Sequence, residues 1–258
     1  MDLNLNGHRV VVTGAASGIG LEIARGFAAE GAAVMLCDVD PAALQALGDS
    51  DPALRTAVCD VADRDSAARF VAEAVATLGG LDTLVNNAGI AGPTGPVEEI
   101  APDDWDRCLQ VCLTGQFNMA RVAVPHLRGS TNASIINLSS LAGRVGFALR
   151  TPYAAAKWGV IGFTKSLSIE LGQDNIRVNA ILPGLVAGDR QRQVLQAKAQ
   201  RLGKSFAEIE ETAFSYTSIQ DYVTPQQIAD QILFIASEKG RTISGQAISV
   251  CGDTQMLA

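Results

Sequence analysis

Seven short apolar runs alternate with segments of helical periodicity along almost the whole chain. Each run has the length of a buried strand, and in the segments between them apolar residues recur every three to four positions. This alternation is typical of repeated βαβ units, which build a parallel sheet covered by helices on both faces. The sequence therefore predicts an α/β fold, a doubly wound (Rossmann) sheet of about seven strands. The expected strands are residues 9–14, 32–38, 55–61, 81–89, 133–140, 176–184 and 247–252, and the expected helices are 18–30, 41–47, 64–78, 103–128, 153–171 and 225–237.

Length and composition favour one domain with a small-molecule partner. The chain has 258 residues, of which 48% are hydrophobic, and no shift in composition divides it, so we expect residues 1–258 to form a single domain. The formal charge of −7 argues against nucleic acid and anionic membranes, which both reward clustered lysine and arginine. No apolar run is long enough to cross a bilayer, and the N-terminus lacks the regions of a signal peptide, so we expect a cytoplasmic protein.

The cysteines do not indicate a metal centre or a disulfide framework. They are odd in number and scattered, and none is spaced as CxxC. We expect reduced thiols and no metal site. The five are Cys37, Cys59, Cys108, Cys112 and Cys251.

One segment departs from the alternation. Residues 189–222 lie between the sixth expected strand and the last expected helix, with basic residues in the first half and acidic residues in the second. Charge blocks of this kind are usually solvated helix faces. Long insertions at the carboxyl edge of a sheet also cover ligand sites, so a substrate lid at about 185–222 is the functional alternative.

A glycine-rich turn follows the first expected strand. Gly14, Gly18 and Gly20 come between that strand and the start of the next helix. Glycines let the backbone turn sharply and approach a pyrophosphate, and the free N–H groups of the helix start favour its negative charge. The pattern predicts a dinucleotide site.

Asp38 ends the second expected strand, 24 residues after Gly14. A dinucleotide fold places there the carboxylate that accepts hydrogen bonds from the adenosine ribose. The same carboxylate repels a 2′-phosphate, and neither Ser17 nor Val39 supplies a cation to hold one. NAD is therefore the predicted cofactor.

Tyr153 and Lys157 are four residues apart on an expected helix and so share one face. An ammonium beside a phenol favours the phenolate, which can then accept a proton near neutral pH. Ser139 and Ser140 end the strand before that helix, at the edge where ligands bind a doubly wound sheet.

Together these residues resemble the short-chain dehydrogenase/reductase family. The matching segments occur in family order and cover nearly the whole chain. They are the TGxxxGIG turn (Thr13 to Gly20), NNAG (Asn86 to Gly89), a serine thirteen residues before tyrosine (Ser140), YxxxK (Tyr153 and Lys157) and PG (Pro183 and Gly184).

The resemblance implies a role for each matching residue. Tyr153 would exchange the hydroxyl proton, Ser140 would hold the substrate oxygen, and Lys157 would support the tyrosine and bind the nicotinamide ribose. The resemblance also implies a homotetramer formed through residues 103–128 and 153–171. The implied cofactor-binding residues are Gly14, Ser17, Gly18, Ile19, Gly20, Asp38, Asp60, Val61, Asn87, Ala88, Gly89, Tyr153, Lys157, Pro183, Gly184 and Val186.

Cys112 departs from the family pattern. The helix after NNAG usually carries VNLTG, whose asparagine is counted as a fourth catalytic member that supports a water chain to the lysine. This chain has VCLTG instead. A thiol is a weak hydrogen-bonding group and is not expected to replace both arms of an amide. Three interpretations stay open: a tolerated change, a slowed or specialised enzyme, and a cofactor-binding protein without catalysis.

The predicted function is NAD-dependent interconversion of a secondary alcohol and a carbonyl, with Tyr153 as acid/base. The substrate would be a small polar metabolite such as a sugar, a hydroxy acid or a 3-hydroxyacyl compound. Arg144 and Arg150 precede Tyr153 on the loop that walls the substrate side in the family and could bind an anion, but we favour ordinary surface positions for both. The other classes considered are a non-catalytic NAD-binding regulatory protein and a nucleotide-sugar epimerase or dehydratase.

Overall fold

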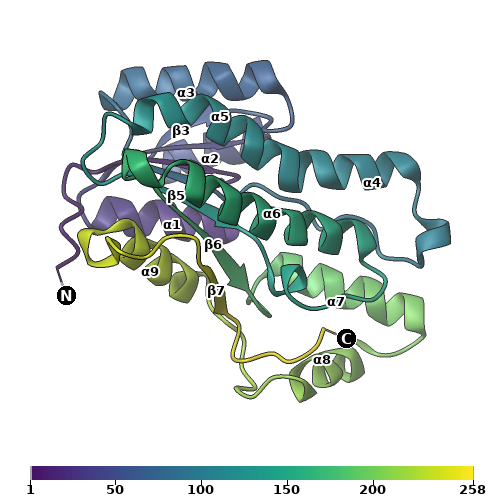
Figure 1. Cartoon of the computed structure of the whole chain (residues 1–258). Helices are drawn as coiled ribbons and strands as arrows, with labels where there is room; N and C mark the ends of the chain where they lie inside the picture. Colours follow the sequence, from purple (N-terminus) through teal and green to yellow (C-terminus); the bar gives the residue numbers. More distant parts are fainter. Residues whose placement is uncertain (1, 258) are drawn as a thin grey trace.

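The computed structural model describes residues 2–257, and its centre is a parallel sheet of seven strands. The strand order is β3-β2-β1-β4-β5-β6-β7, so the chain winds outward in both directions from the β1/β4 pair. Figure 1 shows the sheet between two layers of helices. The doubly wound fold predicted from the alternation is confirmed. The strands are β1 Arg9–Thr13, β2 Ala33–Asp38, β3 Arg55–Val58, β4 Thr83–Asn86, β5 Ser134–Leu138, β6 Arg177–Pro183 and β7 Ala247–Val250.

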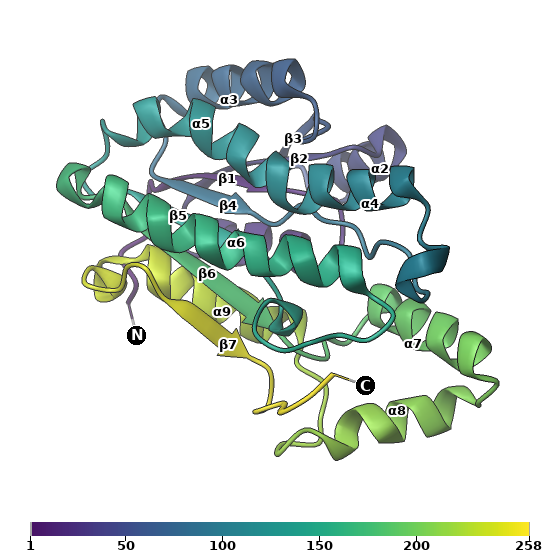
Figure 2. The ribbon, with the colours of Figure 1, turned by 45° about the vertical axis from the view of Figure 1, so that its right-hand side comes forward.

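The helices divide between the two faces of the sheet. Helices α1 (Gly18–Ala29), α2 (Pro41–Ser50) and α9 (Pro225–Ala236) pack in one apolar core. Helices α3 (Arg64–Leu78), α5 (Gly115–Leu127) and α6 (Thr151–Glu170) pack in the other (Figure 2). β4, β5 and β6 are buried along their full length because both of their faces are covered.

The helix expected over residues 103–128 is present, but it is not α-helical throughout. It is divided into α4 (Pro102–Leu109) and α5 by a π-helical turn at Gln110–Thr114. A π turn inserts one extra residue into the helical ladder, a change that apolar periodicity does not reveal, and such turns are frequent at functional sites. Cys112 lies in this turn.

Residues 189–222 contain two further helices, α7 (Asp189–Leu202) and α8 (Phe206–Ser215). Gly203 ends α7 with φ +63°, a left-handed conformation that suits glycine. Ser205 begins α8 with a capping box to Glu208. The two helices share a small apolar core of their own (Figure 1).

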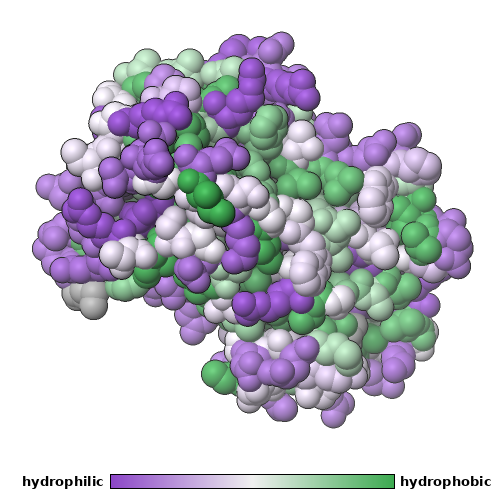
Figure 3. Space-filling view, in the orientation of Figure 1, coloured by the Kyte–Doolittle hydropathy of each residue, from purple (hydrophilic) through white to green (hydrophobic). Residues whose placement is uncertain are grey.

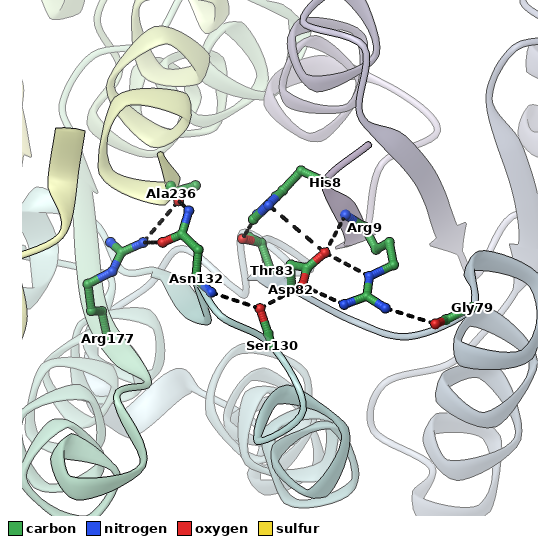
Figure 4. Close-up of polar contacts among 9 residues, drawn as sticks. All are labelled: His8, Arg9, Gly79, Asp82, Thr83, Ser130, Asn132, Arg177 and Ala236. Carbon is green, nitrogen blue, oxygen red and sulfur yellow. Dashed lines mark hydrogen bonds and ion pairs between the residues drawn. The ribbon is translucent and has the colours of Figure 1, made fainter. Parts of the chain in front are cut away.

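A polar network joins several elements at the amino ends of the strands (Figure 4). The Arg9 guanidinium donates to both carboxylate oxygens of Asp82, at 2.8 Å from Nε and 2.7 Å from Nη2, and the Ser130 hydroxyl donates to the same carboxylate at 2.6 Å. Arg177 on β6 donates to Asn132 and to the Ala236 carbonyl at the end of α9, both at 2.9 Å. The network ties β1, β6, α9 and the segments before β4 and β5 together at this edge of the sheet.

Asp82 is the charged centre of that network. Its burial opposes ionisation, but hydrogen bonds from Arg9 and Ser130 prevail and lower the pKa of Asp82 to about 2. A carboxyl whose pKa is depressed in the folded state stabilises the fold above its unfolded pKa, and the stabilisation is lost as the pH falls through the folded value.

We expect Asp82→Asn to lower the free energy of unfolding by about 2 kcal/mol at pH 7, because the ionised partner of Arg9 is lost. The difference from wild type should shrink as the pH falls from about 4 to about 2, where the wild-type carboxylate protonates. Urea unfolding across this pH range measures both effects. Asp174→Asn is the matched control, since its pair with Arg128 is solvent-exposed and should contribute under about 1 kcal/mol. Equal losses in the two variants would contradict the assignment.

Candidate active site

A cavity of about 530 Å³ opens at the carboxyl ends of the central strands. This is the edge at which the chain direction reverses from β1 to β4, the usual ligand position of a doubly wound sheet. Every residue expected to bind the cofactor or to take part in catalysis lines it. These are Gly14, Ser17, Gly18, Ile19, Gly20, Asp38, Asp60, Val61, Asn87, Ala88, Gly89, Ser140, Tyr153, Lys157, Pro183, Gly184 and Val186.

The glycine turn is built for close packing against the segment after β4. Gly14 has φ +61°, and a Cβ there would lie 2.6 Å from the Cα of Ala88. A Cβ on Gly20 would lie 2.5 Å from the side-chain nitrogen of Asn87. Both positions therefore require glycine, the first also because of its left-handed backbone.

Asn87 and Thr13 hold this turn in place. The Asn87 amide donates to the carbonyls of Thr13 (2.9 Å) and Gly14 (2.7 Å), and the Thr13 hydroxyl accepts from the N–H groups of Asn87 (3.1 Å) and Ala88 (3.0 Å). Ser17 makes no side-chain cap at the start of α1. The first N–H groups of that helix therefore remain available to a phosphate, as a pyrophosphate cradle requires.

Two carboxylates line the cavity near the carboxyl ends of β2 and β3. Asp38 accepts from the N–H groups of Ala16 (3.1 Å) and Val39 (2.8 Å), which orients it beside the glycine turn. Asp60 accepts from the N–H of Ala62 and forms an ion pair at 3.4 Å with Arg107 of α4. Arg107 also lines the cavity and was not expected there.

Tyr153 and Lys157 share one face of α6, as their spacing predicts. The Lys157 ammonium lies 5.6 Å from the centroid of the Tyr153 ring and donates to the Leu138 carbonyl at 2.7 Å, at the end of β5. Ser140 accepts from the N–H of Ala142 at 3.1 Å, which sets the direction of its hydroxyl. Ser139 also lines the cavity, but its hydroxyl donates to the Lys157 carbonyl at 2.8 Å. The Ser140 hydroxyl forms no hydrogen bond to α6 among residues 2–257, so it is the one available to a ligand.

The Cys112 thiol both accepts and donates a hydrogen bond, although a thiol was not expected to replace both arms of an amide. Its sulfur accepts from the N–H of Ile90 at 3.3 Å and donates to the Ile90 carbonyl at 3.4 Å. It is fully buried and lies close to Gly89, as does the Lys157 ammonium: each is 3.6 Å from where a Gly89 Cβ would be. The neighbouring Cys108 thiol and the charge of Lys157 lower the pKa of Cys112 against the effect of burial. The opposite member of the pair, Cys108, has a raised pKa.

The two arginines before Tyr153 differ in position. Arg144 lies at the surface and donates to the Ser249 hydroxyl at 3.0 Å, as expected. Arg150, also expected at the surface, is instead 2% exposed and lines the cavity. Its guanidinium lies 5.3 Å from the centroids of both the Phe147 and Tyr153 rings. The loop from β5 to α6 folds back over the site, and sequence spacing does not reveal this.

Arg190 is a further cavity residue that the sequence did not single out. It begins α7, its guanidinium lies 6.0 Å from the Tyr153 ring centroid, and it donates to the Gly89 carbonyl at 3.2 Å. In the sequence it belongs to the basic block that is usually a solvated helix face. Only the position of α7 against the site distinguishes it from its neighbours.

The model for short chain dehydrogenases matches residues 8–199, which include the glycine turn, Tyr153 and Lys157. The chain belongs to the short-chain dehydrogenase family. This family of oxidoreductases binds a nicotinamide cofactor, and the glycine turn, the free N–H groups of α1 and the Asp38 carboxylate fit such a dinucleotide.

Relatives with assigned activities align over nearly the whole chain. The 3-oxoacyl-[acyl-carrier-protein] reductase FabG of Thermotoga maritima is 37% identical over 97% of this chain and 98% of its own length. Cis-4-hydroxycyclohexanecarboxylate dehydrogenase of Sinomonas cyclohexanicum is 36% identical, with 94% of both chains covered. D-beta-hydroxybutyrate dehydrogenase of Cupriavidus necator is 34% identical, covering 93% of this chain and 95% of its own.

Solved structures of the family superpose closely. Xylitol dehydrogenase with bound NAD+ has a TM-score of 0.92 at 27% identity and covers 96% of this chain and 99% of its own. Actinorhodin polyketide ketoreductase with NADPH has a TM-score of 0.89 at 32% identity and covers 95% and 96%. The family thus uses either nicotinamide cofactor on this fold.

We expect Cys112→Ala to lower the free energy of unfolding by about 2 kcal/mol, because it leaves the N–H and C=O of Ile90 buried without partners. Cys112→Ser keeps a donor and an acceptor in place and should lose less. Urea unfolding of the three proteins compares them. An alanine variant as stable as wild type would show that the thiol is only a space-filling group.

Proposed function

We propose that this oxidoreductase interconverts a secondary alcohol and a carbonyl on a small polar metabolite, with NAD as its cofactor and Tyr153 as acid/base. The observation that carries the proposal is the convergence of Tyr153, Lys157 and Ser140 in the cavity that also holds the glycine turn. A bound nicotinamide supplies hydride transfer. The protein must then orient the substrate and move one proton.

Each of the three side chains has a position suited to one part of that task. The Ser140 hydroxyl, oriented by the N–H of Ala142, donates a hydrogen bond to the substrate oxygen. The Tyr153 phenol gives its proton to that oxygen in reduction and takes it back in oxidation. The Lys157 ammonium stabilises the phenolate left behind, because an opposite charge nearby favours the ionised form.

NAD is favoured over NADP by the carboxylate of Asp38. Backbone N–H groups hold it beside the glycine turn, where it accepts from a ribose hydroxyl and repels a 2′-phosphate. Val39 next to it is exposed and brings no charge. Arg107, the basic residue at this end, is already paired with Asp60.

A hydroxy acid or a 3-hydroxyacyl compound is the favoured substrate class. The names of two relatives specify hydroxylated carboxylic acids, and that of a third an acyl-chain ketone. We also propose that residues 185–222 act as a lid, since the first turn of α7 lines the cavity and α8 braces α7. Loops and helices in this position can close over substrate.

We propose a cytoplasmic homotetramer. The surface over α4, α5 and α6 carries apolar side chains among polar ones (Figure 3). Exposed large apolar residues of these helices are Phe117 on α5 and Trp158 and Ile169 on α6. Exposed apolar groups gathered on one face suit contact with a second copy of the chain. No helix in residues 2–257 is both long and apolar enough to pass through a bilayer.

We expect Tyr153→Phe to lower kcat for NAD-linked oxidation by at least about 1,000-fold, because proton transfer is lost while ring packing is kept. Turnover on a panel of hydroxy acids, sugars and secondary alcohols gives kcat, and calorimetry gives the affinity for NAD. Tyr216→Phe is the matched control, a tyrosine outside the residues that line the cavity. Similar kcat values for wild type and Tyr153→Phe would refute the role of Tyr153.

We expect wild type to prefer NAD over NADP by about 100-fold in kcat/KM, and Asp38→Ser combined with Val39→Arg to reverse the preference. The exchange replaces a repelling carboxylate with a cation that can bind the 2′-phosphate. Asp40→Asn is the control, because Asp40 caps α2 nearby and asparagine keeps that cap. A wild-type preference for NADP would overturn the cofactor assignment.

A further inference from the structure

Arg150 is a buried cation whose hydrogen-bonding capacity is mostly unused. One nitrogen, Nη2, donates to the Ala91 carbonyl, while Nε and Nη1 have no partner among residues 2–257. Burial, followed by repulsion from Arg190, lowers the pKa of Arg150, and Tyr153 acts in the opposite direction. The guanidinium nevertheless stays charged, as arginine does in proteins.

No carboxylate compensates that charge. Within residues 2–257, no acidic side chain forms an ion pair with Arg150 or with Arg190. Asp189 also lines the cavity, but it is exposed at the start of α7. A buried charge without a partner costs several kcal/mol, so its retention here indicates that a ligand supplies the missing anion.

Positively charged side chains lie on several sides of the Tyr153 ring, the proposed acid/base. Three cations surround the Tyr153 ring centroid, at 5.3 Å for Arg150, 5.6 Å for Lys157 and 6.0 Å for Arg190. Lys157 is committed to the tyrosine and the Leu138 carbonyl. Arg150 and Arg190 come from different elements, one before α6 and one in the first turn of α7.

The geometry points to a substrate that carries a carboxylate, which Arg150 binds. This inference rests on the proposed function, because it places the carboxylate beside the carbon whose hydroxyl faces Tyr153 and Ser140. Planar guanidinium donors match a planar carboxylate, and a low-dielectric wall strengthens the pairing. Phe147 packs against the same guanidinium and gives the site an apolar side for the substrate carbons. Arg190 adds a second positive charge from the first turn of α7.

A binding experiment tests this without any turnover. Calorimetry on NAD-saturated protein compares cyclohexanecarboxylate with cyclohexanecarboxamide, two probes of nearly equal shape that differ in charge. We expect the acid to bind at least tenfold more tightly than the amide. Arg150→Met should abolish the difference, Arg150→Lys should retain part of it, and the control Arg144→Met should leave it unchanged, because Arg144 lies at the surface.

The wild-type comparison stands even if the Arg150 variants do not fold. Equal affinity for acid and amide in wild type overturns the inference, as does full retention of acid binding in Arg150→Met. Tighter binding of inorganic phosphate than of the acid would also overturn it in favour of a phosphorylated substrate. A clear preference for the acid in a protein that turns over nothing would refute the proposed function and leave the carboxylate site standing.

A kinetic experiment distinguishes two roles of Arg150, binding of the substrate carboxylate and stabilisation of the Tyr153 phenolate. With 3-hydroxybutanoate and its methyl ester as substrates, Arg150→Met should raise KM for the acid at least tenfold and leave kcat/KM for the ester near the wild-type value. If Arg150 only stabilises the phenolate, the variant lowers kcat for acid and ester alike. That result would overturn the inference while supporting the Tyr153 mechanism.

Discussion

The pairing of β1 with β4 is the constraint on which the site depends. These strands lie side by side and parallel although two strands and three helices separate them in sequence, so the segments after both strands meet at one edge. There Asn87 bonds to the carbonyls of Thr13 and Gly14, and the glycine turn packs against the Ala88 backbone. A larger residue at Gly14 or a lost amide at Asn87 disturbs the phosphate cradle and the floor of the cavity together.

Cys112 lies in the π turn before α5, at the position where the family pattern has an amide. A hydrogen bond needs a donor and an acceptor at the right distance, and the Ile90 backbone presents both to the Cys112 sulfur. The thiol thereby satisfies the Ile90 backbone. The three interpretations of this position make different predictions for the kcat of Cys112→Asn relative to wild type.

Charge is divided along the cavity in a way that suits two different ligands. The end formed by β2 and β3 carries Asp38 and the Asp60–Arg107 pair, which favour a neutral ribose. The end formed by α6 and α7 carries Arg150 and Arg190, which favour an anion. Under the proposed function, the cavity disfavours a 2′-phosphate at the first end and binds the substrate carboxylate at the second.

The sequence by itself determined the doubly wound fold, because the alternation of apolar runs and helical segments leaves few other solutions. It also determined which residues meet in the cavity, because parallel strands bring the segments that follow them to one edge, and the family pattern identified them in order. Only the tertiary structure decided the π turn at Gln110–Thr114, the burial of Arg150 and the approach of Arg190. Periodicity does not register one extra residue in a helix, and whether a charged side chain meets water or a cavity depends on how distant elements pack around it.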